Sequence, residues 1–396
     1  MPDLAVGLTK WSLDVSPDKA VAVRRAPVSP PTKTPRELIG EALESPFQFE
    51  PLRRALTPDD RIAVVLDADL PHTAELLSGL LAHLGTAGIV PAAVTVITPP
   101  GSRQDWIDEL PDEFADVTAE THDPADRKKL AYLASSQSGR RVYLNRTLVE
   151  SDFMVVLTGR RFDPVRGYAG AEVALYPDLA DEEIRAANAG PYTKQSPWDG
   201  RNESREVAWL LGTPFLVQII EGEGDTIQSV VAGLLDSSDE GRRRQDAMWK
   251  WQADTHADAA IAAISGDPAR ITFLDLAKAA ACAARAVKKG GRIALLTDAG
   301  PPLGEAAEMI RSLDDPKSPP TRLAKDKPAD WPACKLWCFA ASRASLFLAS
   351  EYPDELVEEL FAAPLATPSE VQRLIDAAAS VVVIADAHKA KLEIVE

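Results

Sequence analysis

Residues able to do chemistry are concentrated between Gly159 and Pro177, in the stretch G-R-R-F-D-P-V-R-G-Y-A-G-A-E-V-A-L-Y-P. A guanidinium group offers paired donors to a carboxylate or phosphate, and carboxylates beside arginines can transfer protons. The alternative is a solvated loop whose arginines pair with neighbouring acids, and on these residues alone that alternative is favoured. The functional hypothesis assigns substrate binding to Arg160, Arg161, Arg166 and Tyr168, and proton transfer to Asp163 and Glu172.

A histidine and a lysine elsewhere could complete such a site. His122 precedes Asp123 at the predicted end of a strand, and it is the histidine best placed for acid–base catalysis. A histidine that caps a loop is an equally good interpretation of that pair. Lys278 follows Asp275 by one helical turn, so the two form either an ordinary i,i+3 ion pair or a group that meets a substrate carboxylate. The functional hypothesis makes Lys278 catalytic and Asp275 substrate-binding.

The charge balance limits the partners. The 396 residues include 43 Lys and Arg against 60 Asp and Glu, a net charge of -17. This charge disfavours binding to nucleic acid or to an anionic membrane, and it means that an anionic small ligand needs a local basic pocket. We therefore expect a small carboxylate as the partner, and the sequence does not predict an oligomeric state.

Three cysteines, at 282, 334 and 338, predict neither a disulfide framework nor a zinc site, because no second Cys/His pair lies close by in sequence. We predict no metal site. The chain starts without a secretory signal, and no stretch of about 18 apolar residues occurs, so we expect a cytoplasmic protein.

Alternating strands and helices must position these side chains. A β-branched run at 61–69, a leucine-rich segment at 71–88 and a second strand-like run at 93–98 form a βαβ unit, which predicts a mostly parallel sheet. Further strands are expected at 117–121, 141–144, 153–158 and 215–221. Ligands of such sheets bind beyond the carboxyl ends of the strands, where Ser102 and Arg103 are expected to contact substrate.

A charged helical stretch at 235–258 leads to a predicted domain boundary near residue 260. The expectation is a larger N-terminal α/β domain, residues 1–260, and a smaller C-terminal α/β domain, residues 261–396, with a helix at 274–288. The sequence G-E-G-D at 222–225 resembles half a dinucleotide-binding fingerprint, but its acids would repel a pyrophosphate. A plain turn before a helix at 227–234 is the preferred interpretation.

The order of these pieces resembles the LarA family, the nickel-dependent lactate racemases and related 2-hydroxy acid racemases and epimerases. The resemblance covers most of the chain, and no single motif decides it. It rests on V-V-L-D at 64–67 before a proline-led helix, H-D at 122–123, V-Y-L-N-R at 142–146, E-S-D at 150–152, G-Y-A-G-A at 167–171 in place of a G-F-S-G-G-type loop, L-Y-P at 175–177, Lys278, and V-K-K-G-G at 287–291.

The resemblance implies two α/β domains with a cleft between them. Active members of the family hold a nickel pincer nucleotide attached to a lysine, and they racemise by moving a hydride from the substrate's α-carbon to the cofactor and back. Two histidines serve as acid and base, another binds nickel, and an arginine and a lysine help to hold the substrate.

This sequence departs from the family at nearly all of those positions. Val173 stands in place of the tethering lysine, Asp163 and Ser102 in place of two histidines, and Leu70 in place of the arginine. Ala189 occupies the position expected for the nickel ligand. Valine cannot form the covalent link and alanine cannot coordinate nickel, so we predict no cofactor.

Lys278 is the one chemical group of the family that this sequence retains, and the family's glutamine one turn earlier is replaced by Asp275. The expected function is that of a divergent lactate racemase-like protein that binds a small hydroxy acid or related carboxylate in the interdomain cleft. It could be a racemase or epimerase without the tethered cofactor, using Asp163, Glu172, His122 and Lys278. The alternatives are a non-catalytic ligand-binding protein and, ranked last, a pincer enzyme with an unfamiliar attachment.

Overall fold

The computed structural model describes residues 3–24, 32–164, 166–188, 198–317, 328 and 330–394. The predicted nickel-ligand position at 189 therefore lies outside the described residues. Within these ranges, no helix is long and apolar enough to cross a membrane.

The chain forms two compact units, which do not follow a single boundary near residue 260. The first is called here the N-terminal unit and comprises Pro30–Glu221 and Thr226–Gln245. The second, the C-terminal unit, comprises Met1–Ser29, Gly222–Asp225 and Asp246–Glu396. The beginning of the chain and the G-E-G-D turn thus belong with the C-terminal residues.

A six-stranded sheet forms the centre of the N-terminal unit, in the order β13-β12-β9-β4-β5-β6. All neighbours pair in parallel except β12 and β13, which are antiparallel. The expected βαβ unit is present, because β4 leads through α2 to β5. The strands are β4 Ile62–Leu66, β5 Val94–Thr98, β6 Thr118–Thr121, β9 Phe153–Gly159, β12 Phe215–Glu221 and β13 Ile227–Gly233.

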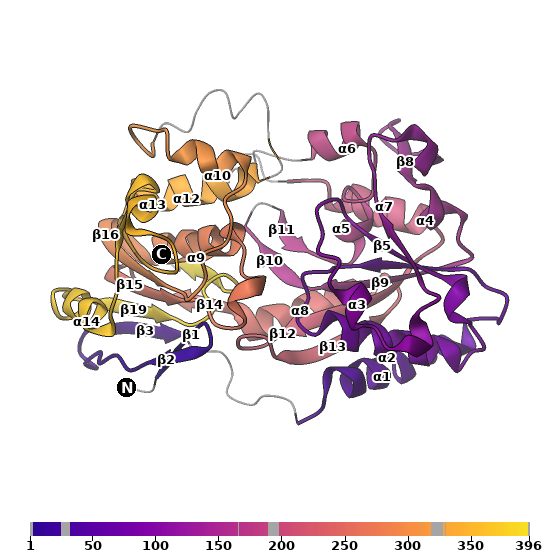
Figure 1. Cartoon of the computed structure of the whole chain (residues 1–396), viewed down its shortest axis with the longest axis horizontal. Helices are drawn as coiled ribbons and strands as arrows, with labels where there is room; N and C mark the ends of the chain where they lie inside the picture. Colours follow the sequence, from indigo (N-terminus) through magenta and orange to yellow (C-terminus); the bar gives the residue numbers. More distant parts are fainter. Residues whose placement is uncertain are drawn as a thin grey trace. The chain divides into compact units, whose positions relative to one another are not determined.

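Helices cover both faces of this sheet (Figure 1). One buried cluster joins α1 and α2 to residues such as Val64 and Leu157, and another joins the opposite face to α4, α5 and α7. Strands β7 and β8 form an antiparallel hairpin outside the main sheet. The elements are α1 Pro35–Glu44, α2 Thr73–Gly85, α3 Trp106–Glu109, β7 Leu130–Ser135, β8 Arg141–Asn145, α4 Arg146–Glu150, β10 Arg161–Asp163, β11 Gly167–Ala169, α5 Glu172–Leu175, α6 Glu182–Ala187, α7 Arg201–Leu210 and α8 Ser237–Trp249.

The C-terminal unit has its own six-stranded sheet, in the order β18-β17-β16-β15-β19-β3 and parallel throughout. Its edge strand β3 comes from the start of the chain. The strands are β1 Leu4–Val6, β2 Thr9–Trp11, β3 Ala20–Arg24, β14 Lys250–Ala253, β15 Ala257–Ala263, β16 Val287–Leu296, β17 Ser345–Ala349, β18 Ala362–Pro364, β19 Val381–Ile384 and β20 Lys391–Ile394.

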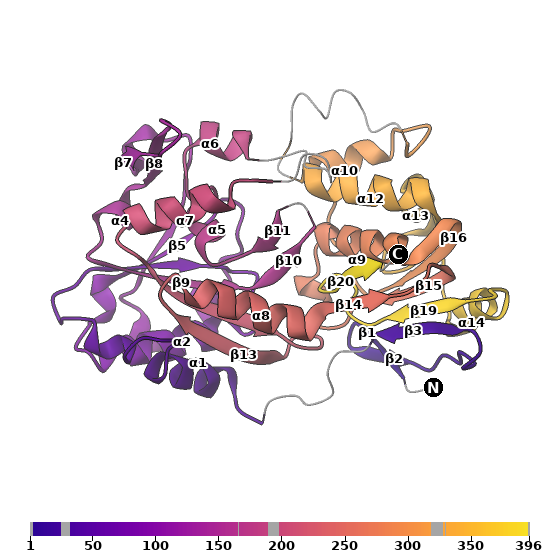
Figure 2. The ribbon, with the colours of Figure 1, turned by 180° about the vertical axis from the view of Figure 1, so that it is seen from behind.

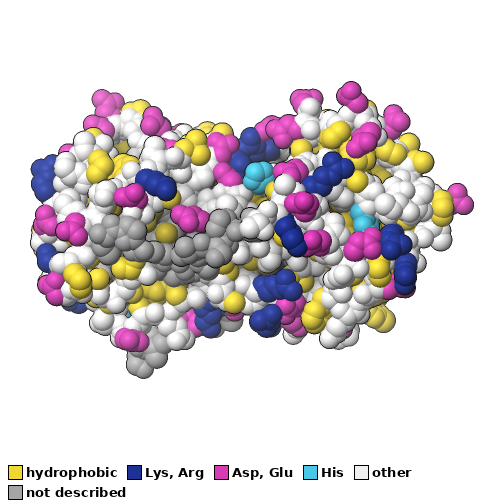
Figure 3. All heavy atoms as spheres, turned by 90° about the horizontal axis from the view of Figure 1, so that it is seen from below, with side chains coloured by type: hydrophobic (Ala, Val, Ile, Leu, Met, Phe, Trp, Pro, Cys, Tyr) yellow, Lys and Arg dark blue, Asp and Glu magenta, His cyan; other side chains and the backbone are white. Residues whose placement is uncertain are grey.

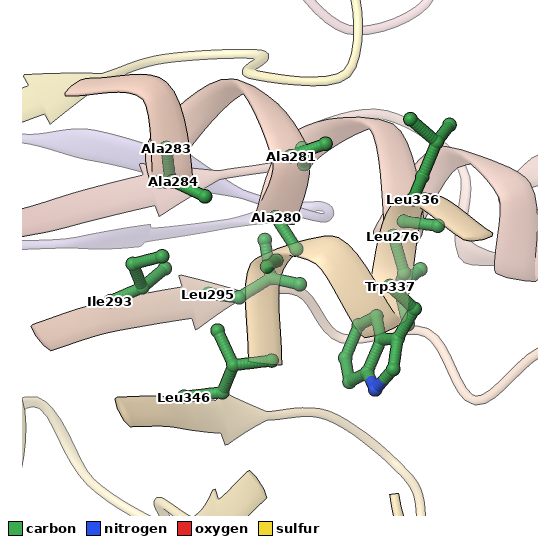
Figure 4. Close-up of a cluster of buried hydrophobic side chains, with 14 of the residues drawn as sticks. Leu276, Ala280, Ala281, Ala283, Ala284, Ile293, Leu295, Leu336, Trp337 and Leu346 are labelled. Carbon is green, nitrogen blue, oxygen red and sulfur yellow. The ribbon is translucent and has the colours of Figure 1, made fainter. Parts of the chain in front are cut away.

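The alanine-rich helix α9, Phe273–Ala286, packs one face of this sheet together with α12, Trp331–Arg343 (Figure 2). Ala280 and Ala284 are fully buried on α9, and their small side chains let the helix lie close to Ile293 and Leu295 of β16 (Figure 4). Helix α14, Pro368–Asp376, and β1 bury apolar residues against the opposite face. The remaining helices are α10 Glu305–Ile310 and α13 Asp354–Glu359.

The charged helical stretch predicted at 235–258 ends at Trp249, where β14 begins. Two further segments differ from the sequence prediction. Residues 227–233 form strand β13 rather than a helix, because they pair with β12 and bury Val230 and Val231. The helix predicted to reach residue 288 ends at Ala286, and β16 begins at once with Val287, which pairs with Ala257. In both cases strand pairing decides the conformation of a segment whose local sequence also suits a helix.

Candidate functional site

Arg161 occupies the point where the strand order of the N-terminal sheet reverses. The chain passes from β4 outward to β5 and β6, while β9 and β12 lie on the other side of β4. Arg161 follows β9, and its guanidinium contacts Asp67 beyond β4 at 2.5 Å and Glu221 at the end of β12 at 2.6 Å. Burial disfavours the charge on Arg161, but the two carboxylates outweigh it and raise the pKa of the guanidinium. Ligands of open α/β sheets bind in this crevice, and here it holds an internal ion network.

Arg160 lies in the interior, with its side chain 1% exposed. Its guanidinium is 3.3 Å from Ser238 Oγ and 3.9 Å from the Glu172 carboxylate, which is itself fully buried. Ser238 Oγ donates to Glu172 at 2.6 Å, and the Tyr168 ring lies 5.5 Å from the guanidinium carbon. Burial lowers the pKa of Arg160. The structure therefore brings Arg160, Tyr168 and Glu172 together, as a buried cluster within the N-terminal unit.

The glycine-rich loop at 167–171 lies against the end of β9. Gly170 has φ 78°, and a Cβ there would stand 2.1 Å from the carbonyl oxygen of Gly159, so only glycine fits. Ala171 also has a positive φ, 52°, and its N–H donates to Thr158 Oγ1 at 2.9 Å. Helix α5 follows directly, and Val173 in it is 3% exposed.

Arg166 and Asp163 lie at the end of the short β10–β11 hairpin. Arg166 forms an ion pair with Asp178 at 2.8 Å, and its guanidinium carbon lies 5.8 Å from the Trp198 ring. Asp163 accepts a hydrogen bond from the backbone N–H of Arg166 at 3.0 Å. The three arginines of this stretch that the sequence predicted as ligand-binding groups are thus engaged with groups of the same unit.

His122 is 1% exposed at the end of β6. Its Nε2 lies 2.9 Å from the carbonyl oxygen of Ala180, and burial lowers the pKa of the ring, so the neutral imidazole is the form that fits. This geometry supports the loop-capping interpretation. After β5, Ser102 is half-buried, and Arg103 pairs with Asp105, its neighbour two residues on, at 2.9 Å.

Lys278 and Asp275 lie near the start of α9 in the C-terminal unit. The Lys278 ammonium is 3.8 Å from Asp275 Oδ1, and the two side chains are 18% and 21% exposed. Thr272 begins the helix, and its hydroxyl donates to Asp275 Oδ2 at 2.6 Å. Burial opposes ionisation of Asp275, but Lys278, His388 and Thr272 outweigh it and hold the pKa of that carboxyl below its usual value. His388 is thus a neighbour of this pair that sequence reasoning did not select, because it lies over 100 positions further along the chain.

The loop that carries this histidine is fixed by two buried charged residues. Asp386, 1% exposed, accepts from the N–H of Ser265 at 2.9 Å and from the N–H of Gly224 at 3.0 Å. Lys389 donates to the carbonyl oxygens of Gly222 and Gly224 at 3.0 and 2.5 Å. The G-E-G-D turn is therefore a structural element of the C-terminal unit, held between the ends of β15 and β19.

Comparisons with known proteins agree with this architecture. The family model described as the lactate racemase N-terminal domain matches residues 6–194. The match covers a little under half of the chain and places residues 6–194 in the lactate racemase family. The fold class predicted from the sequence is confirmed: the structure of the lactate racemase apoprotein from Thermoanaerobacterium thermosaccharolyticum is similar over 99% of each chain, with a TM-score of 0.80 at 16% identity.

A crystal structure of a protein from Thermotoga maritima is also similar, with a TM-score of 0.65 at 12% identity over 91% of this chain and 98% of that one. No curated protein matches this sequence. At such identities the solved structures establish the fold alone. The chemistry of this protein has to be argued from its own residues.

The pincer cofactor of the lactate racemase family does not fit the residues present at its expected attachment. Val173 at that position is aliphatic and enclosed, and the adjacent Glu172 is fully buried beside Arg160. No step through this cofactor follows from these side chains. The departures that the sequence predicts at Asp163 and Ser102 involve side chains that are half-buried in this family member.

Proposed function

We propose that this lactate racemase-like protein binds a small hydroxy acid or related carboxylate through Lys278, without a tethered pincer cofactor. The observation that supports this most is the loose pairing of Lys278. Its ammonium lies 3.8 Å from Asp275, whereas the pairs made by Arg161 and Arg166 are 2.5–2.8 Å long. A lysine that is mostly buried and weakly paired retains donors for a ligand carboxylate, and the attraction is stronger where water is partly excluded.

The surroundings of Lys278 also support its proposed role in binding a carboxylate. It extends from α9, a helix packed along most of its length, so its backbone is fixed. Asp275 is held by the capping box at the helix start, and it orients the ammonium without contacting it closely. A carboxylate that approaches Lys278 therefore meets a cation whose position is set by the fold.

The test combines binding with composition. Titration of the full chain with lactate and other small 2-hydroxy acids by calorimetry should give saturable binding that Lys278→Met abolishes. Lys289→Met, which removes an exposed lysine of the same unit, should leave it unchanged. Equal binding by the Lys278 variant would refute the assignment.

The cofactor half of the proposal needs its own measurement. Intact mass and nickel content should be determined on protein co-expressed with the enzymes that make the pincer nucleotide. We expect the mass of the unmodified chain. A covalent adduct with near-stoichiometric nickel would show that our interpretation of Val173 is wrong.

A second candidate, isomerisation at the α-carbon, rests on the position of His388. This histidine and Lys278 both act electrostatically on Asp275, so a possible proton carrier and a carboxylate-binding cation lie in one unit. One base would remove the α-proton and a protonated group would return it to the opposite face, with no net oxidation. Glu172 and His122 do not enter this scheme, because both are enclosed.

Solvent exchange distinguishes this candidate from simple binding. In D₂O, the full chain would incorporate deuterium at the α-carbon of a bound hydroxy acid, and His388→Gln would stop the exchange while binding persists. His256→Gln serves as the matched histidine control in the same unit. Binding without exchange would leave the non-catalytic carboxylate-binding function.

A further inference from the structure

A pocket of about 620 Å³ in the N-terminal unit lies between the β7–β8 hairpin and helix α6. These elements lie beside one another, joined by a bridge between Leu144 and Ala180 (Figure 2). None of the predicted site residues lines the pocket. Its polar lining consists of Arg127, Arg140, Arg141, Tyr143, Asp181 and Glu183.

Two of the three arginines are positioned by tyrosines. The guanidinium of Arg127 lies 5.2 Å from the centre of the Tyr143 ring. Arg140 donates to the hydroxyl of Tyr176 at 3.2 Å, a contact that raises the pKa of Arg140. Burial raises the pKa of Tyr176 to about 12, so its hydroxyl stays neutral. These contacts orient two guanidinium groups without cancelling their positive charge.

The carboxylate contacts of these arginines are long. Arg127 is 3.5 Å from Asp181, and Arg140 is 3.4 Å from Glu203. Asp181 is also committed to helix α6, since its Oδ1 accepts from the N–H of Ile184 at 3.0 Å. Arg141 forms no ion pair with any described residue. The pocket lining thus carries three arginines against two carboxylates, in a chain that is strongly acidic overall.

We propose that this pocket binds the phosphate group of a small phosphorylated ligand. A phosphate dianion carries three terminal oxygens and twice the charge of a carboxylate, which suits three guanidinium groups lining one pocket. Asp181 and Glu183 would accept hydrogen bonds from hydroxyl groups of the ligand, and a sugar phosphate or nucleoside phosphate carries such hydroxyls. The volume accommodates a ligand larger than phosphate alone. This inference is independent of the carboxylate function proposed for Lys278.

Calorimetric titration of the full chain at low ionic strength tests the proposal, with inorganic phosphate as the first probe. Saturable binding is expected, and Arg127→Gln and Arg141→Gln should each weaken it about fivefold or more, since each removes a charge-assisted contact. Arg54→Gln is the matched control, because Arg54 is an exposed arginine of the same unit without an ion pair among the described residues. Its phosphate affinity should stay within about twofold of the parent.

Two further ligands distinguish the source of the phosphate. Tighter binding of AMP than of ribose 5-phosphate would indicate a nucleotide, and similar binding of the two would indicate a sugar phosphate. Circular dichroism of each variant confirms that the fold is retained. No saturable phosphate binding up to about 10 mM, or equal weakening in Arg54→Gln, would overturn the proposal.

Discussion

Two groups of arginines in the N-terminal unit differ in what holds them. Arg161 and Arg166 of the 160–166 group end on carboxylates at 2.5–2.8 Å, and Arg160 is enclosed beside Glu172. In the pocket between the β7–β8 hairpin and α6, Arg127 lies over the Tyr143 ring and Arg140 donates to the Tyr176 hydroxyl. The carboxylate contacts of these two arginines are 3.4–3.5 Å long. The first group has its charge balanced by the fold, and the second has charge left over for a ligand.

The density of arginines along the chain is therefore a poor guide to anion binding. The surface of this acidic protein mixes Lys and Arg with Asp and Glu on the face shown in Figure 3, so most arginines meet an acid nearby. What makes an arginine available is a neighbour that fixes its geometry without cancelling its charge. Substitutions in the two groups should therefore act on different properties: stability in the first and binding in the second.

The largest effect is expected at Arg160. Arg160→Met leaves the buried Glu172 carboxylate with Ser238 and, at 3.7 Å, the partly exposed Arg201 as its partners. Breaking a buried ion pair costs about 3–5 kcal/mol, and because Arg201 remains we expect a loss near the lower end of that range. Equilibrium urea unfolding measures the loss. Adding Glu172→Gln to Arg160→Met should restore part of it, because the buried charge, left with only the partly exposed Arg201 opposite it, is then removed. A loss below about 1 kcal/mol in the single variant would contradict the buried-cluster interpretation.

A smaller loss is expected at Arg161. Arg161→Gln removes charge-assisted contacts to Asp67 and Glu221, which predicts a decrease in the free energy of unfolding of about 1.5–3 kcal/mol. Arg53→Gln, which breaks an exposed pair with Glu44, is the comparison and should change stability much less. Equal effects of the two substitutions would contradict the expected difference between the partly buried Arg161 and the exposed Arg53.

Acid should lower the free energy of unfolding through His122, whose ring is buried at the end of β6. The pKa of His122 is lowered in the folded chain, so its stabilising contribution is complete above the unfolded pKa of about 6.5 and is lost as pH falls below that value. The free energy of unfolding should therefore decline on acidification, and His122→Gln should reduce the slope.

His83 contributes in the same direction, because burial also lowers its pKa, so the slope should be smallest in the His83→Gln/His122→Gln double variant. His72→Gln, at an exposed histidine, is the control. An unchanged slope in the double variant would show that the buried histidines do not govern the acid response.

The smallest stability effect is expected at Arg141. Because this exposed arginine has no ion pair among the described residues, Arg141→Gln should change the free energy of unfolding by less than about 0.5 kcal/mol. The same variant is expected to lose phosphate affinity, which separates binding from folding. A large loss of stability would place Arg141 with the structural arginines instead.

Local sequence was a good guide to the elements with regular patterns. The run that became β4, the leucine-rich helix α2 and the alanine-rich helix α9 were predicted within a few residues of their observed bounds. The start of α1 is set by equally local residues: Thr34 and Glu37 form a capping box, and Pro35 begins the helix. These features depend on neighbours within one or two turns, so the sequence contains their causes.

The candidate sites depended on residues far apart in the chain. His388 meets Asp275, and Arg127 and Arg140 meet in one pocket with a helix that begins near residue 182, contacts that no local pattern encodes. The adjacency of Arg140 and Arg141 beside Tyr143 was the one sequence signal that could have drawn attention to that pocket.

The α/β class, most of the strands and helices and the resemblance to the lactate racemase family could be read from the sequence, because periodicity, capping and motif order are properties of the chain alone. The tertiary structure decided that Ile227–Gly233 is a strand, that the start of the chain joins the C-terminal unit, and which arginines are neutralised. Strand partners and ion-pair partners are chosen across long separations, where the energy depends on distance in space and not on position in the chain.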